Sequence, residues 1–511
     1  MLPATSGGSS HAVSLANEQA TYRLMRDIAV ALEPGDLVTL SGDLGAGKTT
    51  FARALIRHLA GDPELPVPSP TFTLMQAYDL PQGPLVHADL YRLDSSSELA
   101  ELGFDDLPKN AIVLLEWPDR AQGFLPADRL DIAFTLAPHL GPEHRNVRIT
   151  GYGAFAARAE RINRIRRFLD STGYAEAARK KIQGDASTRS YERLTLGDQQ
   201  AILMNSPKRP DGPPVRDGKP YSQIAHLAED IKPFVAMANG LRGLGLSAPR
   251  IFEAELEDGL LILEDLGTEV VVQGQPPAPI EERYAAAVDV LVAMHRHKLA
   301  DTVPIAPHVV HKLPRYDMDA LLIEVELLID WYLPKLGVAA SDATRGAYVA
   351  LWREALLPII DSYPTWVMRD YHSPNIIWLP EREGIAKVGL LDFQDAMMGP
   401  APYDLASLLQ DARIDVPEKL EVTLLGRYAK ARRDLDPDFN PADFIKAYST
   451  LAAQRASKIL GIFARLEKRD GKPQYLRHIP RVWNYLQRSL AHPSLAPLNA
   501  WYGVHVPALK V

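Results

Sequence analysis

Residues 42–49 read Gly-Asp-Leu-Gly-Ala-Gly-Lys-Thr and match the phosphate-binding pattern G-x-x-x-x-G-K-[ST] in full. In such a loop, glycines let backbone N–H groups surround phosphate oxygens, the lysine reaches the β- and γ-phosphates, and the hydroxyl binds Mg²⁺. The apolar run 37–40 precedes the loop and a helical pattern over 50–59 follows it, so the phosphate would lie at a helix N-terminus. The segment predicts a site for ATP and Mg²⁺ formed by Gly42, Asp43, Leu44, Gly45, Ala46, Gly47, Lys48, Thr49 and Thr50.

The sequence around this loop alternates short apolar segments with helical stretches, from about residue 15 to residue 150. Continuous apolar runs such as 112–115 are typical of strands buried on both faces of a parallel sheet. We therefore predict an α/β P-loop NTPase domain with a mostly parallel sheet. Because the pattern breaks into His, Gly, Pro and Arg around 138–153, this domain is predicted to cover residues 1–153.

Two acidic residues of this domain stand where apolar segments end, namely Asp89 and Glu116. Ligands bind at the C-terminal ends of strands in open α/β sheets. A nucleotide site also needs a carboxylate near the metal and a group that orients water. Each carboxylate alone would more often be a surface charge, but beside a phosphate-binding loop both are predicted to belong to the site.

Four segments, taken in order, resemble the TsaE family of bacterial ATPases, which support formation of threonylcarbamoyladenosine at position 37 of tRNA. They are 42–49, 68–74 (Pro-Ser-Pro-Thr-Phe-Thr-Leu), 87–93 (His-Ala-Asp-Leu-Tyr-Arg-Leu) and 115–118 (Leu-Glu-Trp-Pro). The resemblance covers roughly the first 150 residues. The alternative is another small P-loop protein, such as a nucleotide or shikimate kinase.

The resemblance implies roles for single residues. Thr49 and Asp89 would hold Mg²⁺, and Glu116 would be the acidic catalytic residue. Trp117 would lie beside the nucleotide, and Thr71 would belong to a switch-like loop. It also implies that the domain hydrolyses ATP while bound to the threonylcarbamoyl transferase complex, so that its partner is protein and tRNA is contacted only indirectly.

A second phosphate site is predicted downstream. Residues 369–375, Arg-Asp-Tyr-His-Ser-Pro-Asn, have the D-x-x-x-x-N spacing of a kinase catalytic loop, and Leu-Leu-Asp-Phe-Gln follows at 390–394. In such sites the first Asp accepts the proton of the acceptor hydroxyl, while the Asn and the second Asp hold Mg²⁺ at the phosphates. Asp370 is therefore the predicted catalytic base, and Asn375 and Asp392 are the predicted metal ligands.

The surrounding sequence is strand-rich before about residue 265 and mainly helical after it, which predicts a two-lobed protein-kinase-like (α+β) domain over 154–511. The lobes would be 158–265 and 266–511. The small-residue turn at 184–189 is predicted to cover the phosphates, although taken alone it would more often be an ordinary turn. The strand 261–267 is predicted to lead into a hinge that meets adenine. The nucleotide-binding residues predicted there are Asp185, Ala186, Ser187, Thr188, Glu264 and Asp265. Asp404 is predicted to be structural, as a helix N-cap.

These segments resemble the aminoglycoside phosphotransferase family, and more closely its branch of cell-wall amino-sugar kinases. The closer match rests on 184–187, 392–396 and 454–463, and the resemblance spans about residues 158–497. It implies phosphorylation of the anomeric hydroxyl of N-acetylmuramate or N-acetylglucosamine, a step of cell-wall sugar recycling. An antibiotic kinase and a pseudokinase scaffold are the alternatives. The cations Arg455, Lys458, Arg465, Arg469 and Lys472 would suit a carboxylated sugar better than a polycationic antibiotic.

One feature departs from the wider kinase pattern. The third strand of the small lobe normally carries a lysine for the α- and β-phosphates, but residues 201–204 read Ala-Ile-Leu-Met. Lys208, in the following proline-rich loop, is the candidate substitute, and the role of Glu229 on the presumed regulatory helix is open as well.

The composition agrees with a two-enzyme chain. A length of 511 residues predicts two to four domains, and a hydrophobic content of 46% supplies apolar surface for their cores. The net charge of −8 does not favour a surface that coats nucleic acid. Because the chain has no cysteine, disulfides and thiolate metal sites are excluded, which fits the cytoplasm. No secretory signal and no membrane partner are expected.

Overall fold

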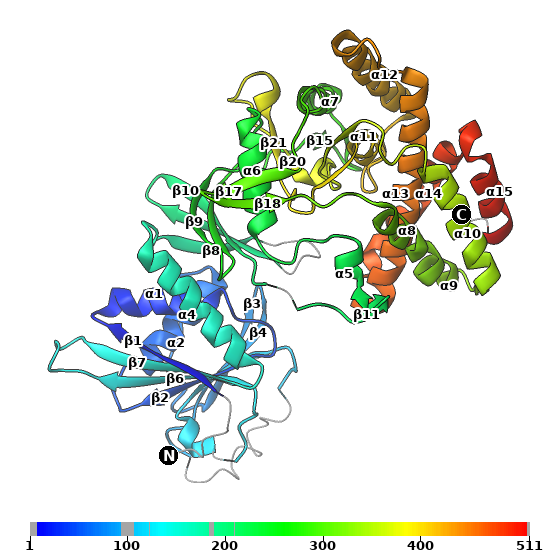
Figure 1. The fold of residues 1–511 in the computed structure, drawn as a ribbon. Coiled ribbons are helices and arrows are strands. Elements are labelled where there is room, and N and C mark those ends of the chain that lie inside the picture. Colours follow the sequence, from blue (N-terminus) through cyan, green and yellow to red (C-terminus); the bar gives the residue numbers. More distant parts are fainter. Residues whose placement is uncertain (1–7, 94–106, 122, 183–188, 209, 508–511) are drawn as a thin grey trace. The chain divides into compact units, whose positions relative to one another are not determined.

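The computed structural model describes residues 8–93, 107–121, 123–182, 189–208 and 210–507 (Figure 1). Its contacts divide the chain into two compact units, Met1–Leu203 and Met204–Val511. This division falls inside strand β10 (Gln199–Asn205), about fifty residues after the predicted boundary at 153/154. Helix α4 (Phe155–Ser171) explains the difference, because it begins after that boundary and yet packs on strands β1 and β7 of the first unit. The boundary itself stays a prediction.

The first unit contains a seven-stranded sheet with the order β1-β7-β6-β2-β5-β4-β3. Its four central strands, β6, β2, β5 and β4, are parallel, whereas β1, β7 and β3 join at the edges by antiparallel pairing. The strands are β1 (Ser9–Leu15), β2 (Leu37–Gly42), β3 (Met75–Leu80), β4 (Gly83–Asp89), β5 (Ile112–Glu116), β6 (Arg129–Leu136) and β7 (Arg145–Tyr152).

The register of this sheet places the two predicted carboxylates together. Glu116, the last residue of β5, is paired with Leu40 of β2 on one side and with Asp89, the last residue of β4, on the other. Helix α2 (Lys48–Ala60) begins within the phosphate-binding loop that follows β2, and α1 (Glu18–Ala29) packs against α2. The loop and both carboxylates therefore lie at the same edge of the sheet.

A second sheet has the order β13-β14-β10-β9-β8. Strand β8 (Ala178–Ile182) pairs antiparallel with β9 (Ser190–Leu196), and β13 (Ile251–Glu255) pairs antiparallel with β14 (Leu260–Glu264). The predicted phosphate-covering residues Asp185, Ala186, Ser187 and Thr188 lie outside the described residues.

Beyond strand β14, the second unit is mainly helical (Figure 1). Its longest helix, α13 (Pro441–Asp470), packs against α8 (Met318–Leu327), α11 (Pro402–Leu409) and α14 (Ile479–Leu490). Gly461 permits the close crossing with α8, because a Cβ at this position would come within 2.3 Å of the Leu327 backbone. The other long helices are α6 (Lys232–Gly243), α7 (Glu281–His295), α10 (Asp342–Leu356), α12 (Glu418–Leu435) and α15 (Ala496–His505).

Two short antiparallel ribbons carry the segments that resemble a catalytic loop. Strand β19 (Pro364–Val367) pairs with β22 (Met397–Pro400), and β20 (Ile376–Trp378) pairs with β21 (Val388–Leu390). Asp370 lies between β19 and β20, and Asp392 follows β21. Within the described ranges, none of the helices combines the length and the apolar composition needed to cross a membrane.

Two candidate nucleotide sites

The phosphate-binding loop borders a cavity of about 260 Å³ in the first unit. Six of the nine predicted loop residues line it, namely Leu44, Gly45, Gly47, Lys48, Thr49 and Thr50. The predicted Asp89, Glu116 and Trp117 line it too, together with Ser69, Thr71 and Tyr91. The position of Gly42 requires glycine, because its φ is +131° and a Cβ there would lie 2.2 Å from the Phe134 carbonyl oxygen. Residues predicted from separate segments of sequence therefore meet at one cavity.

Lys48 lies against its own loop. Its Nζ donates hydrogen bonds to the carbonyl oxygens of Gly42, at 2.7 Å, and Asp43, at 3.0 Å. The ammonium group also lies 3.7 Å from the centre of the Trp117 ring, which places Trp117 beside the phosphate-binding lysine. Burial lowers the pKa of Lys48, although Glu116 and Asp89 act in the opposite direction.

The two carboxylates of this site have different partners. Glu116 accepts a hydrogen bond from the Thr49 hydroxyl over 2.8 Å, and its other oxygen lies 2.9 Å from His87 Nε2. Asp89 accepts hydrogen bonds from Thr71 at 2.8 Å and from Ser69 at 3.3 Å. His87 is a contact of this site for which the sequence predicted no role. Its position two residues before Asp89 on a strand was the available signal, because residues two apart share a face.

The hydroxyl and carboxylate oxygens of this site are suitable ligands for Mg²⁺ bound together with a nucleotide. Hydroxyl and carboxylate oxygens are the ligands that Mg²⁺ prefers, and the ion is usually held by one or two carboxylates together with phosphate oxygens. Among the described residues, no cluster of three or more His, Asp or Glu side chains is arranged to hold a metal. The Thr49 hydroxyl and the Asp89 carboxylate, which line the cavity, are oxygens of the kind that Mg²⁺ prefers.

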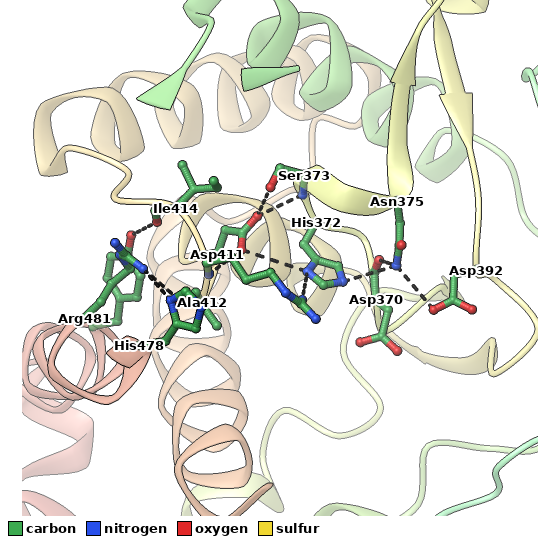
Figure 2. Close-up of polar contacts among 12 residues, drawn as sticks. Asp370, His372, Ser373, Asn375, Asp392, Asp411, Ala412, Ile414, His478 and Arg481 are labelled. Atoms are coloured by element: carbon green, nitrogen blue, oxygen red, sulfur yellow. Dashed lines mark hydrogen bonds and ion pairs between the residues drawn. The ribbon is translucent and has the colours of Figure 1, made fainter. Parts of the chain in front are cut away.

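The predicted residues of the second site also lie together (Figure 2). Asn375 Nδ2 donates to the Asp370 carbonyl oxygen at 2.9 Å and lies 3.4 Å from Asp392 Oδ2. Gln394 Nε2 donates to the other oxygen of Asp392 at 2.9 Å. His372 lies between Asp411 and Asn375, with 3.2 Å between its Nε2 and Asn375 Nδ2.

Two buried aspartates form hydrogen bonds with the loop that contains Asp370 and Asn375. Asp404 accepts the backbone N–H groups of Met368, at 2.7 Å, and Arg369, at 2.9 Å. Asp411 accepts both the N–H and the hydroxyl of Ser373. The prediction that Asp404 caps a helix was wrong, because the N-cap of α11 is Ala401 and the Asp404 carboxylate binds the loop instead. Burial raises the pKa of Asp404 to about 7, despite the two N–H donors.

Positive charges on α13 act on Asp370. Burial opposes its ionisation, but Lys458, His372 and Arg455 outweigh this effect and hold the pKa of Asp370 below its ordinary value. A carboxylate that stays ionised is available to accept a proton.

Glu324, on α8, joins the catalytic loop to α13. It is fully buried and pairs with Arg369, the neighbour of Asp370, and with Lys458, whose Nζ lies 2.8 Å away. Gln454 Nε2 donates to it at 2.9 Å. Burial alone would raise the pKa of Glu324, yet Lys458 and Arg369 lower it to about 2.

The predicted hinge residues form hydrogen bonds and an ion pair with nearby segments. One carboxylate oxygen of Glu264 accepts the Arg250 N–H at 3.0 Å, and the other pairs with Arg382 at 2.6 Å. Asp265 accepts the Gly267 N–H at 2.9 Å. A contact between this segment and adenine stays a prediction.

Known proteins match the two parts of the chain separately. The family model for the threonylcarbamoyl adenosine biosynthesis protein TsaE matches residues 15–145, and that of the phosphotransferase enzyme family matches residues 179–443. The chain belongs to both families. We refer to residues 15–145 as the TsaE module and to the chain from residue 179 onward as the phosphotransferase module.

Curated relatives agree with this division. An N-acetylmuramate/N-acetylglucosamine kinase of Caulobacter vibrioides is 38% identical over 355 residues, which are 66% of this chain and 95% of that protein. A kinase of the same name from Pseudomonas aeruginosa is 34% identical over 321 residues, 62% of this chain and 85% of that protein. The tRNA threonylcarbamoyladenosine biosynthesis protein TsaE of Rickettsia felis is 40% identical over 118 residues, 23% of this chain and 68% of that protein.

These matches confirm both predicted fold classes and the predicted fusion. The TsaE module has the P-loop α/β fold, and the phosphotransferase module has the protein-kinase-like fold. An ATPase family and a phosphotransferase family on one chain imply ATP as the shared nucleotide.

Proposed function

We propose that the chain is a bifunctional enzyme. Its TsaE module would hydrolyse ATP in support of threonylcarbamoyladenosine formation at position 37 of tRNA. Its phosphotransferase module would transfer the γ-phosphoryl group of ATP to the C1 hydroxyl of N-acetylmuramate or N-acetylglucosamine. The observation that carries the second assignment is the grouping of Asp370, Asn375 and Asp392, the first two on a loop held by two buried aspartates, in a chain 38% identical to a kinase of that name.

In the phosphotransferase module, the oxygen of the sugar's C1 hydroxyl forms a bond to the γ-phosphorus. Asp370 accepts the proton that this hydroxyl loses. The bond from that phosphorus to the β–γ bridging oxygen breaks, and ADP leaves. An anomeric hydroxyl is more acidic than an ordinary alcohol, so a carboxylate of low pKa suffices as the base. Asn375 and Asp392 are the residues that would hold Mg²⁺, which neutralises charge on the phosphates, and most of the rate would come from positioning and charge neutralisation.

In the TsaE module, the loop amides and Lys48 would bind the phosphates, with Trp117 beside the nucleotide. Thr49 and Asp89 would hold Mg²⁺, and Glu116 would orient the attacking water. The hydrogen bond between Thr49 and Glu116 supports this grouping, because it joins the metal-binding hydroxyl to the proposed catalytic carboxylate. The partner would be the threonylcarbamoyl transferase complex, with tRNA contacted only through it.

The alternatives for the phosphotransferase module are less well supported. A polycationic antibiotic requires an acidic pocket, whereas the positive charges of Lys458, Arg455 and Arg369 act on Asp370. A pseudokinase has no need for a base, yet the cations around Asp370 keep it ionised beside Asn375. Incubating the purified chain with ATP and a panel of amino sugars and aminoglycosides tests these alternatives together, since each predicts a different phosphorylated product or none. Turnover of ATP with and without the transferase complex tests the TsaE module.

A further inference from the structure

One face of α13 lies against the catalytic loop. Gln454 and Lys458 of this helix bind Glu324, and Glu324 pairs with Arg369, which is adjacent to Asp370 in sequence. Gly461 brings α13 close to α8 and thereby holds this arrangement together. Arg455 follows Gln454 and precedes Lys458 by three residues, so it shares the face of Lys458.

The cations on this face differ in their partners. Lys458 and Arg369 share the single carboxylate of Glu324. Arg469 pairs with Asp470 at the surface, and the Arg465 guanidinium lies over the Tyr221 ring. Arg455 is only 6% exposed, and no residue in the described part of the chain forms a hydrogen bond or an ion pair with its guanidinium.

The titratable groups on which the Arg455 charge acts belong to the loop of Asp370 and to its support. They are Asp370, His372 and Asp404. The Asp404 carboxylate already accepts two backbone N–H groups, and Asp370 is the proposed base. A largely buried arginine whose charge is not neutralised by an ion pair is costly to the fold, so a residue of this kind indicates an anionic ligand.

We propose that Arg455 binds the carboxylate of the lactyl ether of N-acetylmuramate while the C1 hydroxyl of the sugar faces Asp370. Arg455 would thereby favour carboxylated over neutral amino sugars. This inference rests on the proposed function. The planar guanidinium offers two parallel N–H donors to a carboxylate. Arg465 is too remote for this role, because ten residues of helix place it about 15 Å further along α13.

The direct test compares two substrates, N-acetylmuramate and its primary amide, in the wild-type protein and in Arg455→Met. Methionine keeps the apolar stem and removes the charge. Wild-type kcat/KM should be about 10- to 100-fold higher for the acid than for the amide, the range expected for a hydrogen bond to a charged group. Arg455→Met should use acid and amide equally well, whatever overall loss of rate follows from removing a cation that acts on Asp370.

The control is Arg469→Met, which removes an exposed cation from the same helix and should leave all these ratios unchanged. Equal wild-type activity on acid and amide would overturn the proposal even if every variant failed to fold. An Arg455→Met protein that keeps the wild-type preference for the acid over the amide would also overturn it, because Arg455 would then act only on the phosphates or the loop. Wild-type protein that phosphorylates neither sugar would instead refute the proposed function.

Discussion

The hydroxyl of Thr49 donates a hydrogen bond to Glu116, with 2.8 Å between Thr49 Oγ1 and Glu116 Oε2. Asp89, at the adjacent register position, is bound instead by Thr71 and Ser69 of the preceding loop. The two carboxylates of the TsaE module thus contact different segments. Exchanging each for its amide separates their roles.

Asp89→Asn should weaken Mg²⁺-dependent nucleotide binding more than metal-free binding, because Lys48 and the loop amides remain. Glu116→Gln should leave binding nearly unchanged and slow hydrolysis by about 10²-fold or more, as expected when a group that orients or deprotonates water is lost. Nucleotide titrations with and without Mg²⁺, followed by hydrolysis assays with the transferase complex, measure both effects. An Asp89→Asn protein with unchanged Mg²⁺ dependence would show that Asp89 is not a metal ligand.

Lys48→Ala should abolish ATP hydrolysis by the TsaE module and leave sugar phosphorylation nearly intact. Asp370→Asn should do the reverse, because the residues proposed for each site come from a different part of the chain. In Asp370→Asn the loss should appear in kcat with little change in the sugar KM, since the base acts mainly in the transition state. Both activities are assayed on the same preparations. If either folded variant lost both, the two sites would not be independent.

Glu324→Gln should destabilise the phosphotransferase module by about 3–5 kcal/mol, because Arg369 and Lys458 would be left as buried cations without a carboxylate. The pKa of Glu324 is lowered from 4.5 to about 2 in the folded chain. Its contribution to stability is therefore present above pH 4.5 and is lost as the pH falls toward 2. The urea midpoint for loss of sugar phosphorylation measures the first effect. Wild-type and variant midpoints that stay equally far apart between pH 5 and pH 3 would contradict the second.

Asp404 should show the opposite pH dependence. Its pKa is raised from 3.8 to about 7, so the folded chain binds its proton more tightly than the unfolded chain does. The associated stability is present below pH 3.8 and is lost as the pH rises through about 7. Asp404→Asn keeps an oxygen acceptor for the loop N–H groups but does not titrate. The stability of wild-type relative to this variant should therefore be greater at pH 5 than at pH 8, and an equal difference at both pH values would refute the assignment.

Residues close together in sequence were the easiest to predict. Residues 42–49 form a local loop, and Asp370 and Asn375 are five residues apart in a recognisable motif. Both motifs can therefore be identified from the sequence without knowledge of the tertiary structure. Glu324 left no such signal. Its partners Arg369 and Lys458 lie 45 and 134 residues away, and a lone glutamate in a helix is normally a surface charge. Its burial depends on the crossing of α8 and α13, which Gly461 permits.

Asp404 shows a second reason for failure. A carboxylate early in a helix is usually a cap, and only the position of the catalytic loop reveals that Met368 and Arg369 are its donors. Asp411 and His87 were missed for the same reason, because their partners come from other segments of the chain.

The most direct test of the account is the identity of the product formed from ATP and N-acetylmuramate or N-acetylglucosamine, determined by phosphorus and proton NMR. We predict phosphate on C1, with formation of one ADP per sugar and loss of this product in Asp370→Asn. Phosphate on C6, or efficient phosphorylation of an aminoglycoside with no reaction on either sugar, would contradict it.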